Sequence, residues 1–321
     1  MGARILVTSL LVNPQDHQLL TPLYDLGAEL LFHPLHQQRA PGEMAHLLHD
    51  VDAVIASSDH ISAADLEQAH RLRVIARTGV GYDAIDVDAA RQRGIIVTIT
   101  PGANDQAVAD YTLAMMLALS RRLIENHLSV QSGQWSRAVG TDLHSKTIGI
   151  IGLGRIGKQV VKRLYGFEPR MLGHDLVLDT DFMKRYNVMA VSLDQLFEEA
   201  DLITLHIALS AETVHLVNRE RLQKTKRGVF LVNTCRGAVV DEAALIDALR
   251  SGQVGGAALD VFEQEPLSNN PLREFPNVIL SPHVAGISQE SSHLMAQMAI
   301  EEVVRVLRNE PTRYAVNSLG L

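Results

Sequence analysis

The stretch Thr147-Ile148-Gly149-Ile150-Ile151-Gly152-Leu153-Gly154-Arg155-Ile156-Gly157 decides the fold of this chain. A short, mostly apolar run leads into the pattern G-x-G-x-x-G, and the amphipathic segment 158–164 follows. This order is typical of a buried strand, a tight phosphate-binding turn and the start of a helix. Gly152 permits the turn, Gly154 lets a pyrophosphate approach the backbone, and Gly157 lets the helix pack on the strand. The N–H groups at the helix start then face the phosphates.

A carboxylate lies where an adenosine ribose needs one. The run Arg170-Met171-Leu172-Gly173-His174 predicts the next strand, and Asp175 ends it about 20 residues past the glycines. An acid at this place accepts hydrogen bonds from the ribose and repels a 2′-phosphate. The pattern therefore predicts NAD as the cofactor rather than NADP. The alternative is an ordinary packing turn that binds nothing.

Strand-like and helix-like segments alternate almost to the end of the chain, which predicts an α/β architecture with parallel sheets. The first third contains predicted strands at Ile5–Val7, Ala53–Ala56, Val74–Ala76 and Ile95–Ile99, with predicted helices at 14–26, 64–69 and 88–93. Six later runs predict one complete, doubly wound, Rossmann-type sheet: Thr147–Ile151, Arg170–His174, Leu202–His206, Val229–Asn233, Gly256–Leu259 and Val278–Ser281.

The last predicted helix, Gln289 to Leu307, begins after the final strand of that second series. It can therefore return to the first domain and make that domain discontinuous. We predict a substrate domain of residues 1–100 and 287–321, and an NAD-binding domain of residues 101–286.

Composition excludes several classes of function. The chain has 321 residues and a formal net charge of −8, which argues against a nucleic-acid or anionic-membrane surface. The single cysteine, Cys235, excludes an internal disulfide and suits a reducing cytoplasm. The most apolar predicted helix, 107–119, carries Asp110 and is too short to span a bilayer. We therefore expect a soluble, cytoplasmic protein.

Arg236 follows a predicted buried strand, in the segment Asn233-Thr234-Cys235-Arg236-Gly237. It therefore lies at the carboxyl end of a strand, where ligands bind in open α/β sheets. A guanidinium there can hold a carboxylate by two hydrogen bonds and polarise an adjacent keto oxygen. Gly237 indicates a tight loop rather than a helix face, which favours this role over a surface ion pair.

His283 lies in the loop Ser281-Pro282-His283-Val284-Ala285-Gly286, directly after the last predicted strand. Histidine can exchange a proton near neutral pH, although a lone histidine is more often structural and this chain has 14. Glu265, in Phe262-Glu263-Gln264-Glu265-Pro266, also follows a strand end. A carboxylate bonded to His283 would hold the ring and keep its protonated form available. The alternative for Glu265 is a solvated loop acid.

Together these segments resemble the D-2-hydroxyacid dehydrogenase family, which includes phosphoglycerate dehydrogenases and glyoxylate/hydroxypyruvate reductases. The likeness covers nearly the whole chain. It rests on the motifs above, together with Thr78-Gly79-Val80-Gly81-Tyr82-Asp83 and Ala258-Leu259-Asp260-Val261-Phe262. The resemblance implies a Rossmann-type cofactor domain and a flavodoxin-like, discontinuous substrate domain.

The resemblance also implies the reaction, which is hydride transfer between NAD and a small D-2-hydroxy or 2-oxo acid (EC 1.1.1.-). By this likeness His283 is the proton donor, Glu265 is its partner and Arg236 holds the substrate. The backbone of Val80 and Gly81 is expected to bind the substrate carboxylate.

The cofactor site implied by the resemblance contains thirteen positions and no metal. Arg155, Ile156 and Asp175 are expected at the adenosine half, and Thr234, Cys235 and Asp260 near the nicotinamide. The full set is Gly152, Gly154, Arg155, Ile156, Gly157, Asp175, His206, Thr234, Cys235, Arg236, Asp260, His283 and Gly286.

Members of the family are usually homodimers joined through their cofactor domains, and the segment from Ala107 to Val139 matches the dimer arm. Trp135 either reaches the active site of the other subunit or packs within the arm.

The loop Ala56-Ser57-Ser58-Asp59-His60 bears on the substrate. Phosphoglycerate enzymes tend to have a cation here, whereas this chain has no Lys or Arg between Arg39 and Arg71. Asp59 is expected to repel a phosphate, which favours a smaller, unphosphorylated acid. A cation from Arg137 of a neighbouring subunit would change this expectation.

Other functions share the fold. They are 3-phosphoglycerate dehydrogenase, phosphite dehydrogenase and a non-catalytic, NAD-sensing corepressor. Glu265 argues against formate oxidation, because formate enzymes of this type usually have a neutral amide in its place. The same Arg, Glu and His occur in the corepressors, which commonly carry extended tails for their partners.

Overall fold

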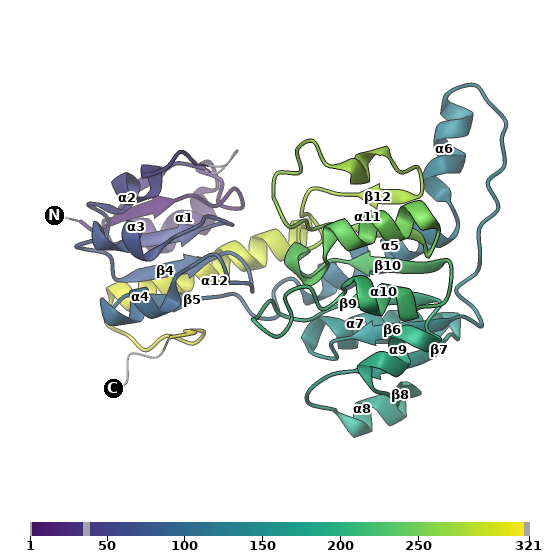
Figure 1. Ribbon diagram of the computed structural model, residues 1–321. Helices are drawn as coiled ribbons and strands as arrows, with labels where there is room; N and C mark the ends of the chain where they lie inside the picture. Colours follow the sequence, from purple (N-terminus) through teal and green to yellow (C-terminus); the bar gives the residue numbers. More distant parts are fainter. Residues whose placement is uncertain (1, 35–38, 318–321) are drawn as a thin grey trace. The chain divides into compact units, whose positions relative to one another are not determined.

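The computed structural model describes residues 2–34 and 39–317, and it divides into two compact units. The first unit contains the residues up to Asn104 together with those from Ser288 onward, and the second contains Asp105–Ile287 (Figure 1). The return of the chain to the first unit is made by α12 (Gln289–Leu307), which contacts α1, β3 and β4. Ser288 begins this helix with a capping box, because its side chain and that of Ser291 each accept the other's backbone N–H.

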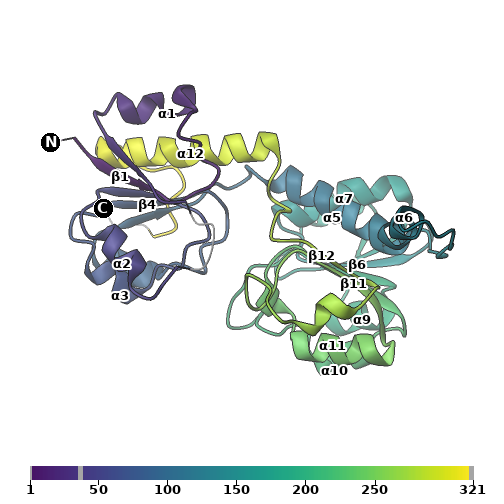
Figure 2. The same ribbon diagram turned by 90° about the horizontal axis from the view of Figure 1, so that it is seen from above.

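The first unit is a five-stranded parallel sheet in the order β2-β1-β3-β4-β5, which is the flavodoxin-like order. Its strands are β1 (Arg4–Val7), β2 (Glu29–Phe32), β3 (Ala53–Ala56), β4 (Val74–Arg77) and β5 (Ile96–Thr98). Its other helices are α1 (His17–Tyr24), α2 (Glu43–Leu48), α3 (Ala63–Glu67) and α4 (Val87–Gln92). Figure 2 shows α1 and α12 on one face of this sheet and α2 and α3 on the other.

The second unit is a seven-stranded parallel sheet in the order β12-β11-β10-β9-β6-β7-β8. Its strands are β6 (Thr147–Ile151), β7 (Arg170–His174), β8 (Val188–Ala190), β9 (Leu202–Leu205), β10 (Val229–Asn233), β11 (Val254–Leu259) and β12 (Val278–Leu280). The strand order reverses between β6 and β9, and ligands bind beyond the carboxyl ends of the strands at such a reversal.

Helices cover both faces of the second sheet. Figure 2 shows α5, α6 and α7 on one side of it and α9, α10 and α11 on the other. The bounds are α5 (Asp105–Ser120), α6 (Leu123–Gln131), α7 (Arg155–Leu164), α8 (Thr180–Arg185), α9 (Leu193–Glu199), α10 (Arg219–Lys224) and α11 (Glu242–Ser251), with short 3₁₀ turns at Tyr165–Phe167, Gly237–Val239 and Pro271–Glu274.

The prediction of six strands in the second sheet is wrong by one. The additional strand, β8, is three residues long, lies at the sheet edge and exposes Met189 and Ala190. The edge strand β2 of the first sheet was likewise not predicted, because it begins with the exposed Glu29 and none of its residues is fully buried. Each of these two strands contains only three apolar residues, which is too short a run to distinguish a strand from a segment of helix by its pattern.

Candidate active site

The glycine turn has the geometry that a pyrophosphate requires. Gly152 has φ +96, and a Cβ there would lie 2.4 Å from the carbonyl oxygen of His206. A Cβ on Gly157 would lie 1.9 Å from the carbonyl oxygen of Gly152. By contrast, a Cβ on Gly154 would meet nothing within 4 Å, so the backbone there faces open space. Among the described residues no side chain caps the start of α7, which leaves its N–H groups available to an anion.

Asp175 lies beside this turn. Its Oδ2 atom accepts the backbone N–H of Leu153 at 2.5 Å, and its Oδ1 atom accepts that of Val177 at 3.2 Å. The carboxylate therefore joins the end of β7 to the glycine turn at the end of β6. After it come Leu176 and Val177, which are 98% and 81% exposed. An adenosine bound here would meet one fixed acid and two uncovered apolar side chains.

Two other predicted cofactor residues lie in the first turn of α7. Arg155 is its first residue, and its Nε atom lies 2.9 Å from a carboxylate oxygen of the buried Asp105. The guanidinium remains largely exposed. Ile156 is half-buried and packs against the core between the sheet and α5 and α7.

His206 packs against the glycine turn at Gly152. Its Nε2 atom lies 2.9 Å from the hydroxyl of Thr204, and its buried Nδ1 atom has no partner among the described residues. Burial lowers the pKa of His206 to about 3, so the ring is neutral at physiological pH. Its carbonyl oxygen is the atom that forbids a side chain at Gly152. His206 therefore shapes the turn through its backbone.

The loop that carries Arg236 is held by Asn233, to which the sequence assigned no role. The amide oxygen of Asn233 accepts the N–H of Cys235 at 3.0 Å, and its amide nitrogen donates to the carbonyl oxygen of Arg236 at 2.8 Å. The guanidinium of Arg236 is half-buried, and one of its nitrogens donates to the carbonyl oxygen of Cys235 at 2.6 Å. The fixed loop holds this cation at the carboxyl end of β10.

Thr234, which is buried, and Cys235, which is half-buried, complete that loop. The Thr234 hydroxyl lies 2.9 Å from the hydroxyl of Thr112 on α5, so it is turned toward the helix. Burial raises the pKa of the Cys235 thiol to about 11, and its S–H donates to Asn233. Cys235 is therefore protonated at neutral pH and has no nucleophilic character there.

His283 and Glu265 meet at the carboxyl end of the sheet. The Nδ1 atom of His283 lies 2.7 Å from Oε2 of Glu265, and Oε1 of Glu265 accepts the N–H of Phe262 at 3.0 Å. Burial alone would raise the pKa of the Glu265 carboxyl. The bond to His283 and its charge, the N–H of Phe262 and the charge of Arg236 together hold that pKa below its ordinary value. Glu265 is therefore an anion at neutral pH.

Asp260 organises the loop that carries His283. It is fully buried, and its carboxylate accepts the hydroxyl of Ser281 at 2.6 Å and the N–H groups of Val284 and Ala285 at 2.9 and 2.8 Å. Its carbonyl oxygen accepts the N–H of His283 at 2.8 Å. His283 has φ +53, which is uncommon for a residue with a side chain, and these bonds hold it there. Gly286 directly follows this anchored segment.

In the first unit, the turn after β4 presents backbone N–H groups. Val80 and Gly81 are half-buried, and within the described part of the chain their N–H groups donate to no other group. The Arg77 side chain fixes the turn by donating to the carbonyl oxygens of Gly81 and Ser57. Unpaired N–H groups on a fixed turn are suited to a carboxylate.

The expectation that Asp59 repels a phosphate is wrong. Asp59 is 3% exposed, and its Oδ1 atom accepts the Nε–H of Arg39 at 2.9 Å. Its Oδ2 atom accepts the Thr8 hydroxyl at 2.5 Å and the N–H of Ser57 at 3.1 Å. The acid is buried and paired with a cation, so it presents no bare charge. The partner, Arg39, lies 20 residues away in sequence, which concealed the pairing.

Known proteins resemble this chain in sequence and in fold. Residues 113–285 match the model of the D-isomer specific 2-hydroxyacid dehydrogenase NAD-binding domain. A glyoxylate reductase of Thermofilum pendens is 42% identical over 86% of this chain and 84% of its own. The chain belongs to the D-isomer specific 2-hydroxyacid dehydrogenase family.

Two other relatives indicate how widely the family extends. A D-3-phosphoglycerate dehydrogenase of Synechocystis is 39% identical over 87% of this chain, which spans about half (51%) of that longer protein. The crystal structure of D-lactate dehydrogenase from Aquifex aeolicus, complexed with NAD and lactic acid, superimposes with a TM-score of 0.86 and 28% identity, covering 98% of this chain and 99% of the other.

Membership in the 2-hydroxyacid dehydrogenase family makes this protein an NAD-dependent oxidoreductase. The glycine turn fits that cofactor, because Gly152 and Gly157 leave no room for side chains while Gly154 faces open space. Bound NAD would be held by this turn, by the start of α7 and by Asp175.

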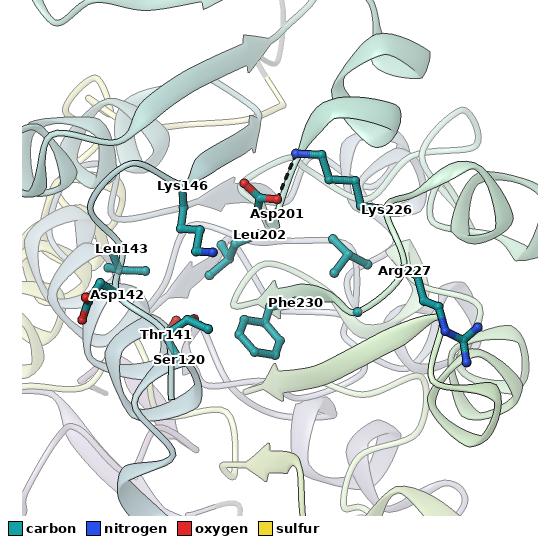
Figure 3. A pocket seen from close by; sticks show the side chains of 12 residues that line it. Ser120, Thr141, Asp142, Leu143, Lys146, Asp201, Leu202, Lys226, Arg227 and Phe230 are labelled. Atoms are coloured by element: carbon teal, nitrogen blue, oxygen red, sulfur yellow. Dashed lines mark hydrogen bonds and ion pairs between the residues drawn. The ribbon is translucent and has the colours of Figure 1, made fainter. Parts of the chain in front are cut away.

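A separate pocket of about 220 Å³ lies at the amino ends of β6, β9 and β10 in the seven-stranded sheet (Figure 3). It is lined by Lys146, Lys226 and Phe230, among others, and Lys226 pairs with Asp201 at 2.9 Å. Arg236 lies at the carboxyl end of β10, so this pocket is not part of the candidate active site. No helix in the described ranges is long and apolar enough to cross a membrane.

Proposed function

We propose that this protein reduces a small, unphosphorylated 2-oxo acid to the D-2-hydroxy acid with NADH, and catalyses the reverse reaction with NAD. The observation that carries the proposal is the hydrogen-bonded pair formed by His283 and Glu265, whose Nδ1 and Oε2 atoms are 2.7 Å apart. The pair lies at the carboxyl ends of the strands of the same sheet that holds Arg236. These are the groups that hydride transfer to a carbonyl requires: a proton donor, a group that holds it and a cation.

Each side chain has a chemical task that follows from its surroundings. His283 uses Nδ1 to donate to Glu265, which leaves Nε2 to give its proton to the substrate oxygen. The anionic Glu265 stabilises the protonated ring. The guanidinium of Arg236 holds the carboxylate and stabilises the charge that develops on the oxo oxygen. Bound NADH supplies the hydride for C2 of the substrate.

The N–H groups of Val80 and Gly81 are proposed as further donors to the substrate carboxylate. They belong to a turn that Arg77 fixes through two carbonyl oxygens, so they need no rearrangement to bind an anion.

The pairing of the nearby cations supports an unphosphorylated substrate. The three nitrogens of Arg39 donate to Asp59, to Glu43 and to the carbonyl oxygen of His33. Arg77 is engaged with the backbone of Ser57 and Gly81. Binding of a phosphate would first have to break these hydrogen bonds. It would therefore cost more free energy than binding to unpaired cations.

A second candidate is 3-phosphoglycerate oxidation. It is favoured by the 39% identity with D-3-phosphoglycerate dehydrogenases, and by Asp59, which offers no bare charge against a phosphate. Phosphohydroxypyruvate therefore belongs in every substrate panel for this protein.

We also propose that the protein is a cytoplasmic homodimer. Helix α6 has no buried residue, and apolar side chains stand exposed along it and the segment that follows. They are Leu123, Ile124, Leu128, Val130, Trp135 and Val139. Covering such a patch is a common reason for association. Light scattering should give the mass of a dimer for the wild type and of a monomer for Leu128→Asp, with Met189→Asp on β8 as the exposed control. A monomeric wild type would contradict the proposal.

The reaction itself is tested with NADH that carries deuterium at C4 of the nicotinamide. The protein is incubated with glyoxylate, hydroxypyruvate, pyruvate and bulkier 2-oxo acids, and the products are analysed by mass spectrometry. We expect deuterium at C2 of a 2-hydroxy acid from at least one small 2-oxo acid. Binding of NADH without transfer to any of them would contradict the proposed function.

A further inference from the structure

The loop from Glu263 to Asn270 carries Glu265 and is closed at both ends by one buried acid. That acid is Glu242, the first residue of α11, which is 9% exposed. Its Oε1 atom accepts the N–H of Glu263 at 2.6 Å, and its Oε2 atom accepts an amide N–H of Asn270 at 2.7 Å. Each carboxylate oxygen therefore holds one end of the loop.

The contact is reciprocal at the first end. The backbone N–H of Glu242 donates to Oε1 of Glu263 at 3.2 Å, while the backbone N–H of Glu263 donates to the Glu242 side chain. His215 also contacts Glu263 at this end of the loop, because its Nε2 atom lies 2.9 Å from the same Oε1 atom of Glu263. A buried carboxylate is tolerated only when it is hydrogen-bonded, and the Glu242 carboxylate meets that condition entirely through this loop.

The same segment of chain also supports the Arg236 loop. A Cβ on Gly237 would lie 1.8 Å from the carbonyl carbon of Phe262, so the two backbones are in direct contact. Phe262 in turn donates its N–H to Glu265. The backbone that carries Arg236 and the backbone that orients Glu265 are therefore packed together.

We propose that Glu242 is a positioning residue, which closes the loop from Glu263 to Asn270 and thereby holds Glu265 at hydrogen-bond distance from His283. Its importance for turnover rests on the proposed function, whereas its effect on the geometry of the pair does not. Glu242 acts through Glu265, and its effect is on the pair rather than on the cofactor.

The test compares the wild type with Glu242→Ala, Glu242→Gln and Asp247→Ala. The glutamine keeps one acceptor oxygen and can hold only one end of the loop. Asp247 is an exposed acid on the same helix, paired with Arg219 at 2.7 Å, and is the matched control. The titration of the Glu265 carboxyl is followed by carbon NMR on full-length protein labelled at the glutamate carboxyl carbons, with Glu265→Gln to assign the signal.

We expect Glu242→Ala to raise the pKa of Glu265 toward its ordinary value, because a loosened loop weakens the bond to His283. Glu242→Gln should give a smaller rise and Asp247→Ala none. The kcat for the 2-oxo acid should fall about 10- to 100-fold in Glu242→Ala, the effect expected of a misplaced catalytic group. The KM for NADH should stay within about twofold.

An unchanged Glu265 titration in folded Glu242→Ala would overturn the proposal, whatever happens to turnover. Should the alanine variant fail to fold, Glu242→Gln decides by the same readout. A wild type that turns over no 2-oxo acid would contradict the proposed function alone, because the titration does not depend on activity.

Discussion

The Nδ1 atom of His283 lies 2.7 Å from Oε2 of Glu265, and the other oxygen of that carboxylate accepts the backbone N–H of Phe262. One acid therefore ties the ring to the end of β11. Because Asp260 accepts the backbone N–H groups of His283 and Val284 and the hydroxyl of Ser281, His283 is held through its main chain as well as through its ring. Such a fixed donor needs little reorganisation when a substrate arrives.

Replacing His283 by alanine should reduce turnover by about 10²- to 10⁴-fold, the usual contribution of a positioned acid–base group. NADH binding should persist, because the glycine turn and Asp175 are untouched. Stopped-flow assays and NADH fluorescence titration measure the two effects separately. His144→Ala, at an exposed position, is the control. Comparable turnover in His283→Ala would remove this residue from the mechanism.

Replacing Asp175 by alanine should weaken NADH binding by roughly 10- to 100-fold, the value of one charge-assisted hydrogen bond. It should also narrow the preference for NADH over NADPH, because the repulsion of a 2′-phosphate is lost. Asp175→Asn removes the charge but keeps an acceptor for the N–H of Leu153. It therefore distinguishes the loss of the charge from a disturbance of the glycine turn. Asp181→Ala is the exposed control. An unchanged cofactor preference in both Asp175 variants would mean that another residue reads the ribose.

The Glu265–His283 pair should stabilise the folded protein less as the pH falls. The pKa of Glu265 is lowered in the folded protein, from an ordinary value of 4.5, so the unfolded chain binds more protons in the window below that value. Its stabilisation is complete above about 4.5 and is lost as the pH falls through the folded-state pKa. Urea unfolding between pH 3 and 7 checks this. The stability advantage of the wild type over Glu265→Gln should shrink on acidification. A pH-independent difference would contradict the assignment.

The buried hydroxyl pair of Thr112 and Thr234 should couple in a double-mutant cycle. Thr112→Val leaves the buried Thr234 hydroxyl without its partner, at a cost of about 1–3 kcal/mol in the free energy of unfolding. Replacing both by valine should cost less than the sum of the two single changes. Urea unfolding of the four proteins measures the coupling, and strict additivity would show that the two hydroxyls do not depend on each other.

The sequence predicted the parts of the fold that are signalled locally. The apolar run at Thr147–Ile151 and the helix Gln289–Leu307 have the predicted bounds, because continuous burial and a capping serine leave a strong pattern. The half-exposed edge strands β2 and β8 leave almost none. The carboxyl ends of predicted strands likewise located Arg236, Glu265 and His283, since a parallel sheet brings such ends to one edge.

Contacts between loops that are distant in sequence could not be predicted. The role proposed for Glu242 depends on Glu263 and Asn270, which are 21 and 28 residues away in sequence. From the sequence alone, Glu242 is an ordinary acid at the start of a helix. Asp59 was misjudged for the same reason, since its partner Arg39 comes from another loop. Asn233 bonds within its own loop, and an amide at the last position of a buried strand was the signal that could have found it.

The proposed substrate class is tested most directly by comparing kcat/KM with NADH for glyoxylate, hydroxypyruvate and phosphohydroxypyruvate on the same preparation. We expect efficient reduction of at least one of the first two acids. We also expect a much lower kcat/KM for the phosphorylated acid, because Arg39 and Arg77 are already paired. A clear preference for phosphohydroxypyruvate would contradict the proposed substrate and assign these arginines to a phosphate.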